Sequence, residues 1–227
     1  GGTGFSFSAL RPRGDVVQET GGVAGGPVSF MRIYDAATEQ IRQGGRRRGA
    51  NMGVLDVTHP DIEAFITAKR EEGAFRNFNL SVATTEAFWR ALDEGSTYAL
   101  VNPRTGEAVA EADPRRILDL VAETAWATGD PGLLFLDPIN DANPTPALGR
   151  IAATNPCGEV PLLPYEACVL GSVNLALHAE GESVAWGTLR ETVHTAVRLL
   201  DNTIEASHFP IPDLEERVAA TRKIGLG

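Results

Sequence analysis

Residues 154–159, Thr-Asn-Pro-Cys-Gly-Glu, place three chemically capable side chains at alternate positions: the amide of Asn155, the thiol of Cys157 and the carboxyl of Glu159. In an extended or looped backbone, residues two apart project to the same side, so these groups can converge on one small molecule. An amide can hold a hydroxyl group, a carboxylate can accept its proton, and a sulfur atom can perform nucleophilic or one-electron chemistry. The spacing alone is equally compatible with a proline-containing loop around a buried, inert thiol.

Four further segments have unusual composition: Gly-Gly-Thr-Gly-Phe-Ser-Phe-Ser at 1–8, Gln-Gly-Gly-Arg-Arg-Arg-Gly-Ala at 43–50, Cys-Val-Leu-Gly-Ser-Val-Asn-Leu at 168–175 and Thr-Arg-Lys-Ile-Gly-Leu-Gly at 221–227. Together with residues 154–159, and in this order, they resemble the large catalytic chain of ribonucleotide reductase from the first residue to the last. The resemblance is closest to the adenosylcobalamin-dependent (class II) branch. It implies an oxidoreductase that converts ribonucleotides, with diphosphates as the expected substrates, to 2′-deoxyribonucleotides for DNA synthesis through a protein thiyl radical.

The resemblance implies a role for each residue of the Asn-Pro-Cys segment. Cys157 matches the radical-bearing cysteine, and the chemistry needs sulfur because a thiyl radical and a ribose C3′–H bond are close in energy. Glu159 would accept the 3′-hydroxyl proton while C2′ loses water, and Asn155 would hold the ribose hydroxyls. Pro156 restricts the residue before it to extended geometry, which holds the loop in one shape. Gly158 completes the expected substrate-binding segment.

Three more residues acquire roles from the same resemblance. Cys168 matches a second redox cysteine whose disulfide partner is expected upstream of Gly1. Gly1 and Gly2 match a backbone segment that lies against the substrate. Because the disulfide partner implied for Cys168 is expected upstream of Gly1, turnover by this fragment alone is not expected.

Residues 43–49 form a basic loop, here called the arginine loop, in a chain that is otherwise acidic. Glycines let backbone amides approach a ligand, and guanidinium groups match phosphates and stack on bases. A solvated basic turn is the alternative. The resemblance implies the loop that links an allosteric specificity site to the substrate base, with Arg11 and residues 21–26 in the neighbouring effector loop. The expected loop residues are Gln43, Gly44, Gly45, Arg46, Arg47, Arg48 and Gly49.

Composition limits the other possibilities. With 227 residues, 43% of them hydrophobic, the chain can bury the core of one domain. A formal charge of −10 argues against a nucleic-acid polymer as partner, because polyanion binders usually carry a basic face. We find no run of about 18 apolar residues and no leader pattern, so neither a membrane span nor a signal peptide is expected. A cytoplasmic location is the default.

Cysteine and histidine usage argues against a metal site. Two cysteines allow neither a disulfide scaffold nor a four-thiolate zinc site. The four histidines, which show no metal-ligand spacing, are expected to be structural or exposed. They are His59, His178, His194 and His208.

Strand-like and helix-like stretches alternate along the chain, which favours an α/β fold with parallel strands. Helices are expected at 27–40, 85–95, 114–128 and 189–206, and after a Thr58 cap; strands are expected at 51–57 and 77–83, and a hairpin at 98–110. Residues 132–137 form an apolar run that looks buried. Periodicity does not decide between a closed barrel and an open sheet. The resemblance implies a ten-stranded α/β barrel with the active-site cysteine on a central loop.

The chain ends look like the middle of motifs, and there is no starting Met. We therefore expect residues 1–227 to be a single partial catalytic barrel domain from a longer chain, with N- and C-terminal parts missing.

Two other functions stay open at this point. One is a class I catalytic chain, which receives its radical from a separate metal-containing subunit; the other is a catalytically silent nucleotide-binding module. The class II interpretation implies adenosylcobalamin as cofactor. It also implies a ribonucleotide substrate, a nucleotide effector, a thioredoxin-like reductant and a homodimer.

Overall fold

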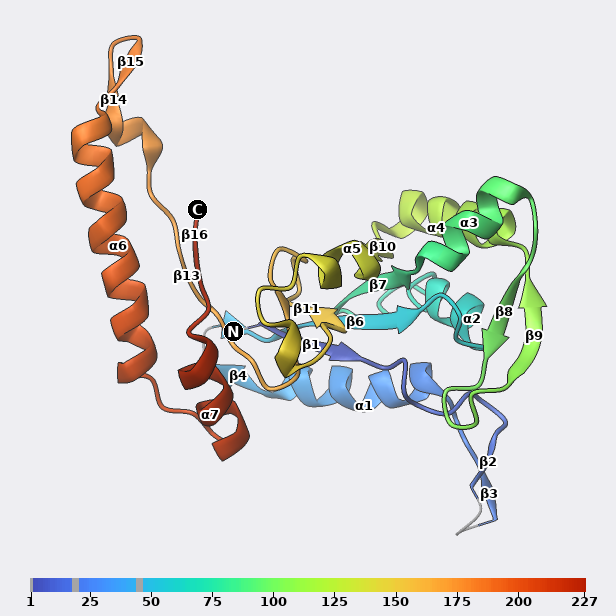
Figure 1. The fold of residues 1–227 in the computed structure, drawn as a ribbon. Helices are drawn as coiled ribbons and strands as arrows, with labels where there is room; N and C mark the ends of the chain where they lie inside the picture. Colours follow the sequence, from blue (N-terminus) through green and yellow to red (C-terminus); the bar gives the residue numbers. More distant parts are fainter. Residues whose placement is uncertain (1, 18–20, 44–46) are drawn as a thin grey trace. The chain divides into compact units, whose positions relative to one another are not determined.

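The structure is a computed structural model that describes residues 2–17, 21–43 and 47–227. It separates into two compact units, Gly1–Pro161 and Leu162–Gly227 (Figure 1). Whether both belong to one barrel domain stays a prediction.

The described elements of the first unit are β1 (Gly2–Ser6), β2 (Val16–Val17), β3 (Gly22–Val23), α1 (Pro27–Gln40), β4 (Arg42–Gln43), β5 (Arg47–Arg48), β6 (Ala50–Asp56), α2 (Ile62–Ile66), β7 (Phe78–Thr84), α3 (Glu86–Glu94), β8 (Tyr98–Val101), β9 (Ala108–Ala112), α4 (Pro114–Thr128), β10 (Gly132–Phe135), α5 (Leu136–Asp141), η1 (Pro146–Leu148) and β11 (Ala153–Thr154). Strand β12 (Pro161–Leu162) lies at the junction. The second unit contains β13 (Val169–Gly171), η2 (Leu175–His178), β14 (Ala179–Glu180), β15 (Ser183–Val184), α6 (Trp186–Ala206), α7 (Pro212–Thr221) and β16 (Ile224–Leu226).

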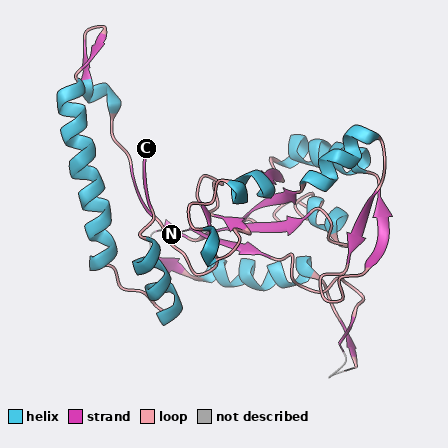
Figure 2. Ribbon diagram, viewed as in Figure 1, coloured by secondary structure: helices cyan, strands magenta, loops and turns pink. Residues whose placement is uncertain are grey.

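Strands β1, β6, β7 and β10 form a four-stranded sheet in that order, and all neighbouring pairs are parallel (Figure 2). The spatial order follows the chain order, so each connection moves the chain one strand further in the same direction. Because crossovers between parallel strands are nearly always right-handed, this order puts the connecting helices on one face of the sheet. The parallel sheet confirms the expected α/β fold class.

The two faces of this sheet carry different layers. On one face, alternate residues of β6 and β7 pack with buried side chains of α1 to α4 in the main core, including Met31, Leu55, Phe65, Leu80, Phe88 and Ile117. On the other face, Met52, Val54, Ala83 and Leu134 form a smaller cluster, against which Leu136 of α5 and Ala153 of β11 pack. Side chains alternate between faces along a strand, which explains the division. Helices α1 to α4 thus cover one face, whereas α5 and the segment leading into residues 154–159 lie on the other.

Local capping chemistry defines several helix ends. Thr85 caps α3 with its side chain, and Gly95 ends this helix in the left-handed region with a φ of 65°. Asp113 caps α4 with its side chain, and Pro114 occupies the first turn. These boundaries were expected from the sequence and are confirmed, as are α1 and the β8–β9 hairpin.

The helix expected after Thr58 begins later than predicted and is short. It covers only Ile62–Ile66, while Thr58 donates its N–H and its hydroxyl to Asp56 at 2.8 and 2.7 Å. The prediction that Thr58 caps the helix is therefore wrong. The physical reason is Pro60, because a residue that precedes proline is disfavoured in helical geometry.

His59 occupies the turn before α2 and is a structural residue. It is buried, its Nδ1 accepts the Asp61 N–H at 3.0 Å, and its Nε2 lies 2.8 Å from the carbonyl oxygen of Leu10. Both ring nitrogens are thus engaged in holding the turn.

In the second unit, β13 and β16 form a parallel pair. Helix α6 begins at Trp186, earlier than the predicted start at Leu189. Leu200 and Ile204 are buried, whereas Val197 of the predicted apolar stripe is 41% exposed. The buried part of the stripe is thus its C-terminal end. Across the described ranges, no helix is long and apolar enough to cross a membrane.

Candidate active site

Residues 155–158 form a tight turn. The carbonyl oxygen of Asn155 accepts the N–H of Gly158 at 3.0 Å. Pro156 stands at the second position, where its restricted φ is favourable, and Gly158 takes a left-handed φ of 85°. Because the positive φ falls on Gly158 and not on Cys157, the turn is of type I. Cys157 occupies its third position.

Asn155 also closes the turn with its side chain. Its Oδ1 accepts the N–H of Val160 at 3.0 Å, and its own N–H donates to the carbonyl oxygen of Val160 at 3.4 Å. The hydroxyl of Thr154 donates to the Asn155 carbonyl oxygen at 2.9 Å. The amide oxygen is therefore used within the turn, which leaves Nδ2 as the donor for a ligand.

Two glycines of β1 allow the turn to lie directly against the sheet. A Cβ atom on Gly4 would be 1.8 Å from the carbonyl oxygen of Thr154, and one on Gly2 would be 2.4 Å from Cδ of Pro156. Real Cβ contacts are not this short, so only glycine permits the observed approach. The predicted contact of Gly2 with substrate stays a prediction.

Asn79 of β7 holds the turn through a hydrogen bond from a second strand of the sheet. The sequence pattern did not predict this role for Asn79. Its Nδ2 donates to the carbonyl oxygen of Pro156 at 2.7 Å. Asn79 and Gly4 are both register partners of Met52, so they share its sheet face, opposite helices α1 to α4. The available signal was a single amide inside the apolar strand Phe78–Thr84, where polar side chains are uncommon.

Exposure differs among the residues of the segment. Cys157 and Glu159 are exposed, Asn155 is half-buried and Pro156 is buried. An exposed thiol can be reached by a ligand, which argues against the alternative of a buried structural cysteine. Because the residues form a turn, strict extended-chain alternation does not describe them. Convergence of the three side chains on a substrate, and substrate contact by Gly158, stay predictions.

Cys168 stands directly before β13 in the second unit and is half-buried. Its Sγ lies 3.8 Å from the carbonyl oxygen of Val169, and a Cβ atom on Gly225 of β16 would lie 3.8 Å from the same sulfur. The thiol is therefore placed at the beginning of the β13–β16 pair. Its redox role stays a prediction.

A buried ion pair fixes the backbone beside Cys168. The carboxylate of Glu166, whose side chain is 0% exposed, accepts the N–H of Leu163 and the Nζ of Lys223, both at 2.7 Å. The carbonyl oxygen of Lys223 in turn accepts the N–H of Val169 at 3.4 Å. Breaking a buried pair by removing one partner is strongly destabilising, so this link holds the segment before β13 to the residue before β16.

The arginine loop is described at its two ends. Arg42 pairs with Arg48 and Gln43 with Arg47 in the antiparallel strands β4 and β5. The side chains of Gln43 and Arg47 are not described. Four expected site residues lie outside the described residues altogether: Gly1, Gly44, Gly45 and Arg46.

Arg48 is engaged within the protein. Its Nη2 donates to Glu39 of α1 and to the Oδ1 of Asn77, the latter at 3.1 Å. The next residue, Gly49, packs closely against α1, because a Cβ atom on Gly49 would lie 2.8 Å from Cγ2 of Thr38. The guanidinium group of Arg48 is thus used as an internal contact. This use was not expected from three adjacent arginines.

Arg11, which was expected in the neighbouring effector loop, lies in a segment that is hydrogen-bonded to the β8–β9 hairpin. Arg11 donates to the carbonyl oxygen of Val16 at 3.0 Å. Asp15 accepts two hydrogen bonds from Arg104, at 3.0 and 3.1 Å, and these bonds lower the pKa of Asp15 to about 2. Asp15 is therefore a carboxylate at neutral pH. Effector contacts of Arg11 stay a prediction.

Comparison with known proteins identifies the family to which this site belongs. Residues 1–227 match the family described as "Ribonucleotide reductase, barrel domain". Over its whole length the chain is 57% identical to the vitamin B12-dependent ribonucleoside-diphosphate reductase of Mycobacterium tuberculosis (strain CDC 1551 / Oshkosh), of which it covers 33%. It is 52% identical to the protein of the same name from Thermoplasma acidophilum, covering 30% of it.

A more distant relative is the ribonucleoside-diphosphate reductase subunit alpha of Chlamydia trachomatis serovar D. The identity is 28% over the whole chain, which covers 25% of that protein. The chain thus spans a third or less of the length of these relatives. Because the family match extends over all of its residues, the chain belongs to the ribonucleotide reductase family and carries sequence of its barrel domain.

Proposed function

We propose that the full-length protein reduces ribonucleotides, with diphosphates as the substrate class, to 2′-deoxyribonucleotides through radical chemistry at Cys157. The observation that carries the proposal is the exposed thiol in a turn that is seated on β1 through Gly2 and Gly4 and fastened to β7 through Asn79. The names of the relatives at 52 and 57% identity support the substrate class. The presence of Asn155, Cys157 and Glu159 together argues against a silent nucleotide-binding module.

Each residue has a defined task in this reaction. Cys157, as a thiyl radical, takes the hydrogen atom from ribose C3′ and later returns it. Glu159 accepts the 3′-hydroxyl proton while the C2′ hydroxyl leaves as water, and Nδ2 of Asn155 donates to a ribose hydroxyl. Cys168 and a second cysteine outside this chain supply two electrons and two protons, so that two thiols become one disulfide for each deoxyribonucleotide formed.

Adenosylcobalamin is the radical source that we propose. When bound, it would supply one-electron chemistry to the Cys157 thiol. The structure fits such a group at Cys157, because a thiol in an exposed turn can be approached by a bulky cofactor. Cobalamin-dependent relatives at 52 and 57% identity, compared with 28% for a subunit alpha, favour this source over a separate metal-containing subunit.

We further propose that the four-stranded sheet is an arc of a ten-stranded α/β barrel, with the Cys157 turn inside it. In a doubly wound sheet, helices cover both faces, whereas in an α/β barrel they form an outer ring. Here helices α1 to α4 share one face, and the Cys157 turn lies on the other together with the short helix α5. The concentration of four helices on one face supports the barrel.

The reaction implies partners. A disulfide that forms at every turnover must be reduced again, which supports a thioredoxin-like dithiol as the reductant. A thiol-dependent cycle suits the reducing cytoplasm. We also include in the proposal a homodimer and a nucleotide effector bound near Arg11 and the arginine loop.

Replacement of Cys168 tests the redox part of the proposal. In the full-length protein, Cys168→Ala is expected to lower steady-state turnover with a protein dithiol reductant by at least about a hundredfold, equivalent to about 2.7 kcal/mol. Hydrogen abstraction should be affected less, since Cys168 acts after it. The measurements are deoxyribonucleotide formed per protein chain over time, and release of tritium from 3′-labelled substrate. Sustained turnover by Cys168→Ala would show that this cysteine does not carry the reducing equivalents.

A further inference from the structure

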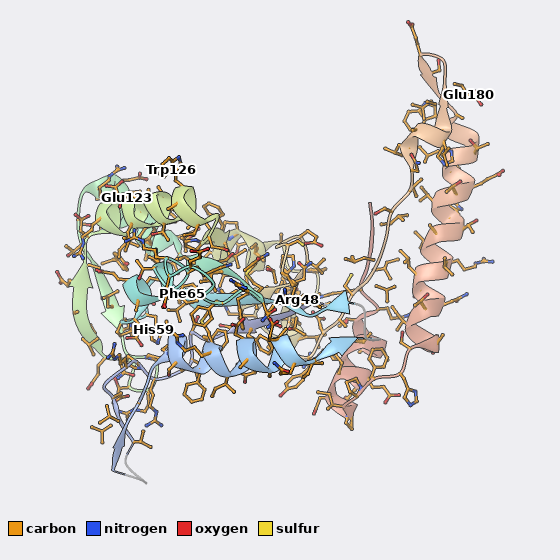
Figure 3. The ribbon with its side chains drawn as sticks, turned by 180° about the vertical axis from the view of Figure 1, so that it is seen from behind. Arg48, His59, Phe65, Glu123, Trp126 and Glu180 are labelled. Carbon is orange, nitrogen blue, oxygen red and sulfur yellow. The ribbon has the colours of Figure 1, made fainter. Side chains whose placement is uncertain are left out.

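The end of the arginine loop is bound to the last turns of α1 by a connected set of polar contacts. Arg48 donates to Glu39 and to the Oδ1 of Asn77, and it lies beside the C-terminal half of α1 (Figure 3). Asn77, only 5% exposed, donates its Nδ2 to Glu39 and to Asp35 of the same helix, each at 3.1 Å. The Asn77 amide thus bonds through both its oxygen and its nitrogen. Such a fully bonded buried group holds its neighbours in one geometry.

A second chain of hydrogen bonds leaves the same turns of α1 towards β1. Thr38, next to Glu39, accepts the Nδ2 of Asn51 at 2.9 Å. Asn51, 4% exposed, accepts the hydroxyl of Thr3 at 2.6 Å. Thr3 stands between Gly2 and Gly4, the two residues on which the Cys157 turn is seated. The adjacent residues Thr38 and Glu39 therefore connect the arginine loop to the strand beneath the candidate active site.

We propose that Thr38 and Glu39 are positioning residues that couple the arginine loop to β1 and so help to determine which nucleotide base is reduced. The inference rests on the proposed function, in which an effector acts through this loop. Arg48 then serves as the anchor of the loop. A partly exposed ion pair alone would contribute little, but here Glu39 also binds buried Asn77, so a shift of Arg48 is transmitted to α1.

The experiment uses the full-length protein with two competing ribonucleoside diphosphates, with and without a deoxyribonucleoside triphosphate. The measured quantity is the effector-dependent change in the ratio of the two products. Coupling between sites commonly amounts to 5- to 150-fold, and we expect Glu39→Gln to reduce the change by roughly tenfold. Arg48→Gln should have a similar effect. The double variant should be little worse than either single one, because both remove the same link.

Matched variants separate this role from a general loss of structure. Glu63→Gln breaks the Glu63–Arg116 ion pair, whose side chains are 48 and 69% exposed, compared with 43 and 54% for Glu39 and Arg48. It should leave the product ratio unchanged. Thr38→Val removes the acceptor for Asn51 and should reduce the effector response, whereas Thr38→Ser keeps a hydroxyl and should restore it.

The outcomes distinguish this inference from the proposed function. A wild-type protein that forms no deoxyribonucleotide overturns the proposed function itself. The coupling through α1 is refuted if the wild type responds to the effector and both Glu39→Gln and Thr38→Val respond as strongly as the wild type. A wild type that reduces ribonucleotides with the same product ratio in the presence and absence of effector refutes the coupling as well.

Discussion

Replacing Cys157 with serine in the full-length protein is expected to abolish deoxyribonucleotide formation while leaving nucleotide binding within about twofold. A serine O–H bond is too strong for an oxygen radical to form usefully, so hydrogen abstraction from the ribose stops. We expect a loss of at least about four powers of ten, equivalent to about 5.5 kcal/mol in the activation barrier. The third position of a type I turn accepts serine, and the side chain is exposed, so the fold should persist.

Two measurements check this expectation together. Product formation by the variant is compared with that of the wild type, and equilibrium binding of a ribonucleoside diphosphate is measured on both proteins. An unchanged thermal unfolding midpoint shows that the loss is chemical. Product above background from Cys157→Ser would remove Cys157 from the reaction.

Replacing Gly4 with alanine is expected to lower activity by at least about a hundredfold and to destabilise the protein. The added Cβ atom would lie 1.8 Å from the backbone carbonyl oxygen of Thr154, and a backbone atom cannot rotate away. Overpacking of this kind costs about 1–3 kcal/mol or more. Relief requires β11 to move off β1, and a displacement of about 1 Å in a catalytic group can reduce the rate about 100-fold.

Gly187→Ala is a matched control for this substitution. A Cβ atom on Gly187 would meet nothing within 4 Å, and the residue lies in the first turn of α6, where alanine is compatible with the helical backbone. This variant should be active and as stable as the wild type or more so. Measurements of activity and thermal unfolding on both variants decide the matter. Wild-type behaviour of Gly4→Ala would mean that β1 and the Cys157 segment are not in direct contact.

Local chemistry explains which elements were predictable. The caps at Thr85 and Asp113 and the glycine stop at Gly95 act within one helical turn, so the residues that decide them are adjacent in the sequence. The late start of α2 has a local cause as well, because Pro60 disfavours helical geometry in the residue before it. Alternation of helices and strands was sufficient for the parallel α/β fold.

The packing of the Cys157 turn on the sheet could not be predicted, because it depends on contacts between residues that are distant in the sequence. Gly4 and Thr154 lie far apart in the sequence, and their close approach follows from packing of the Cys157 segment on the completed sheet. Asn79 could be read only as a polar residue in a strand until the position of Pro156 was known. Three adjacent arginines are equivalent in the sequence, and only the structure shows that Arg48 donates to the buried amide of Asn77.

The most direct test of the central claim is product formation by the purified full-length protein supplied only with adenosylcobalamin, a ribonucleoside diphosphate and a dithiol reductant. The account predicts that 2′-deoxyribonucleoside diphosphate accumulates over many turnovers without a second protein subunit, and that product disappears in Cys157→Ser. No product from the wild-type protein under these conditions, or equal product from the wild type and Cys157→Ser, would contradict the account.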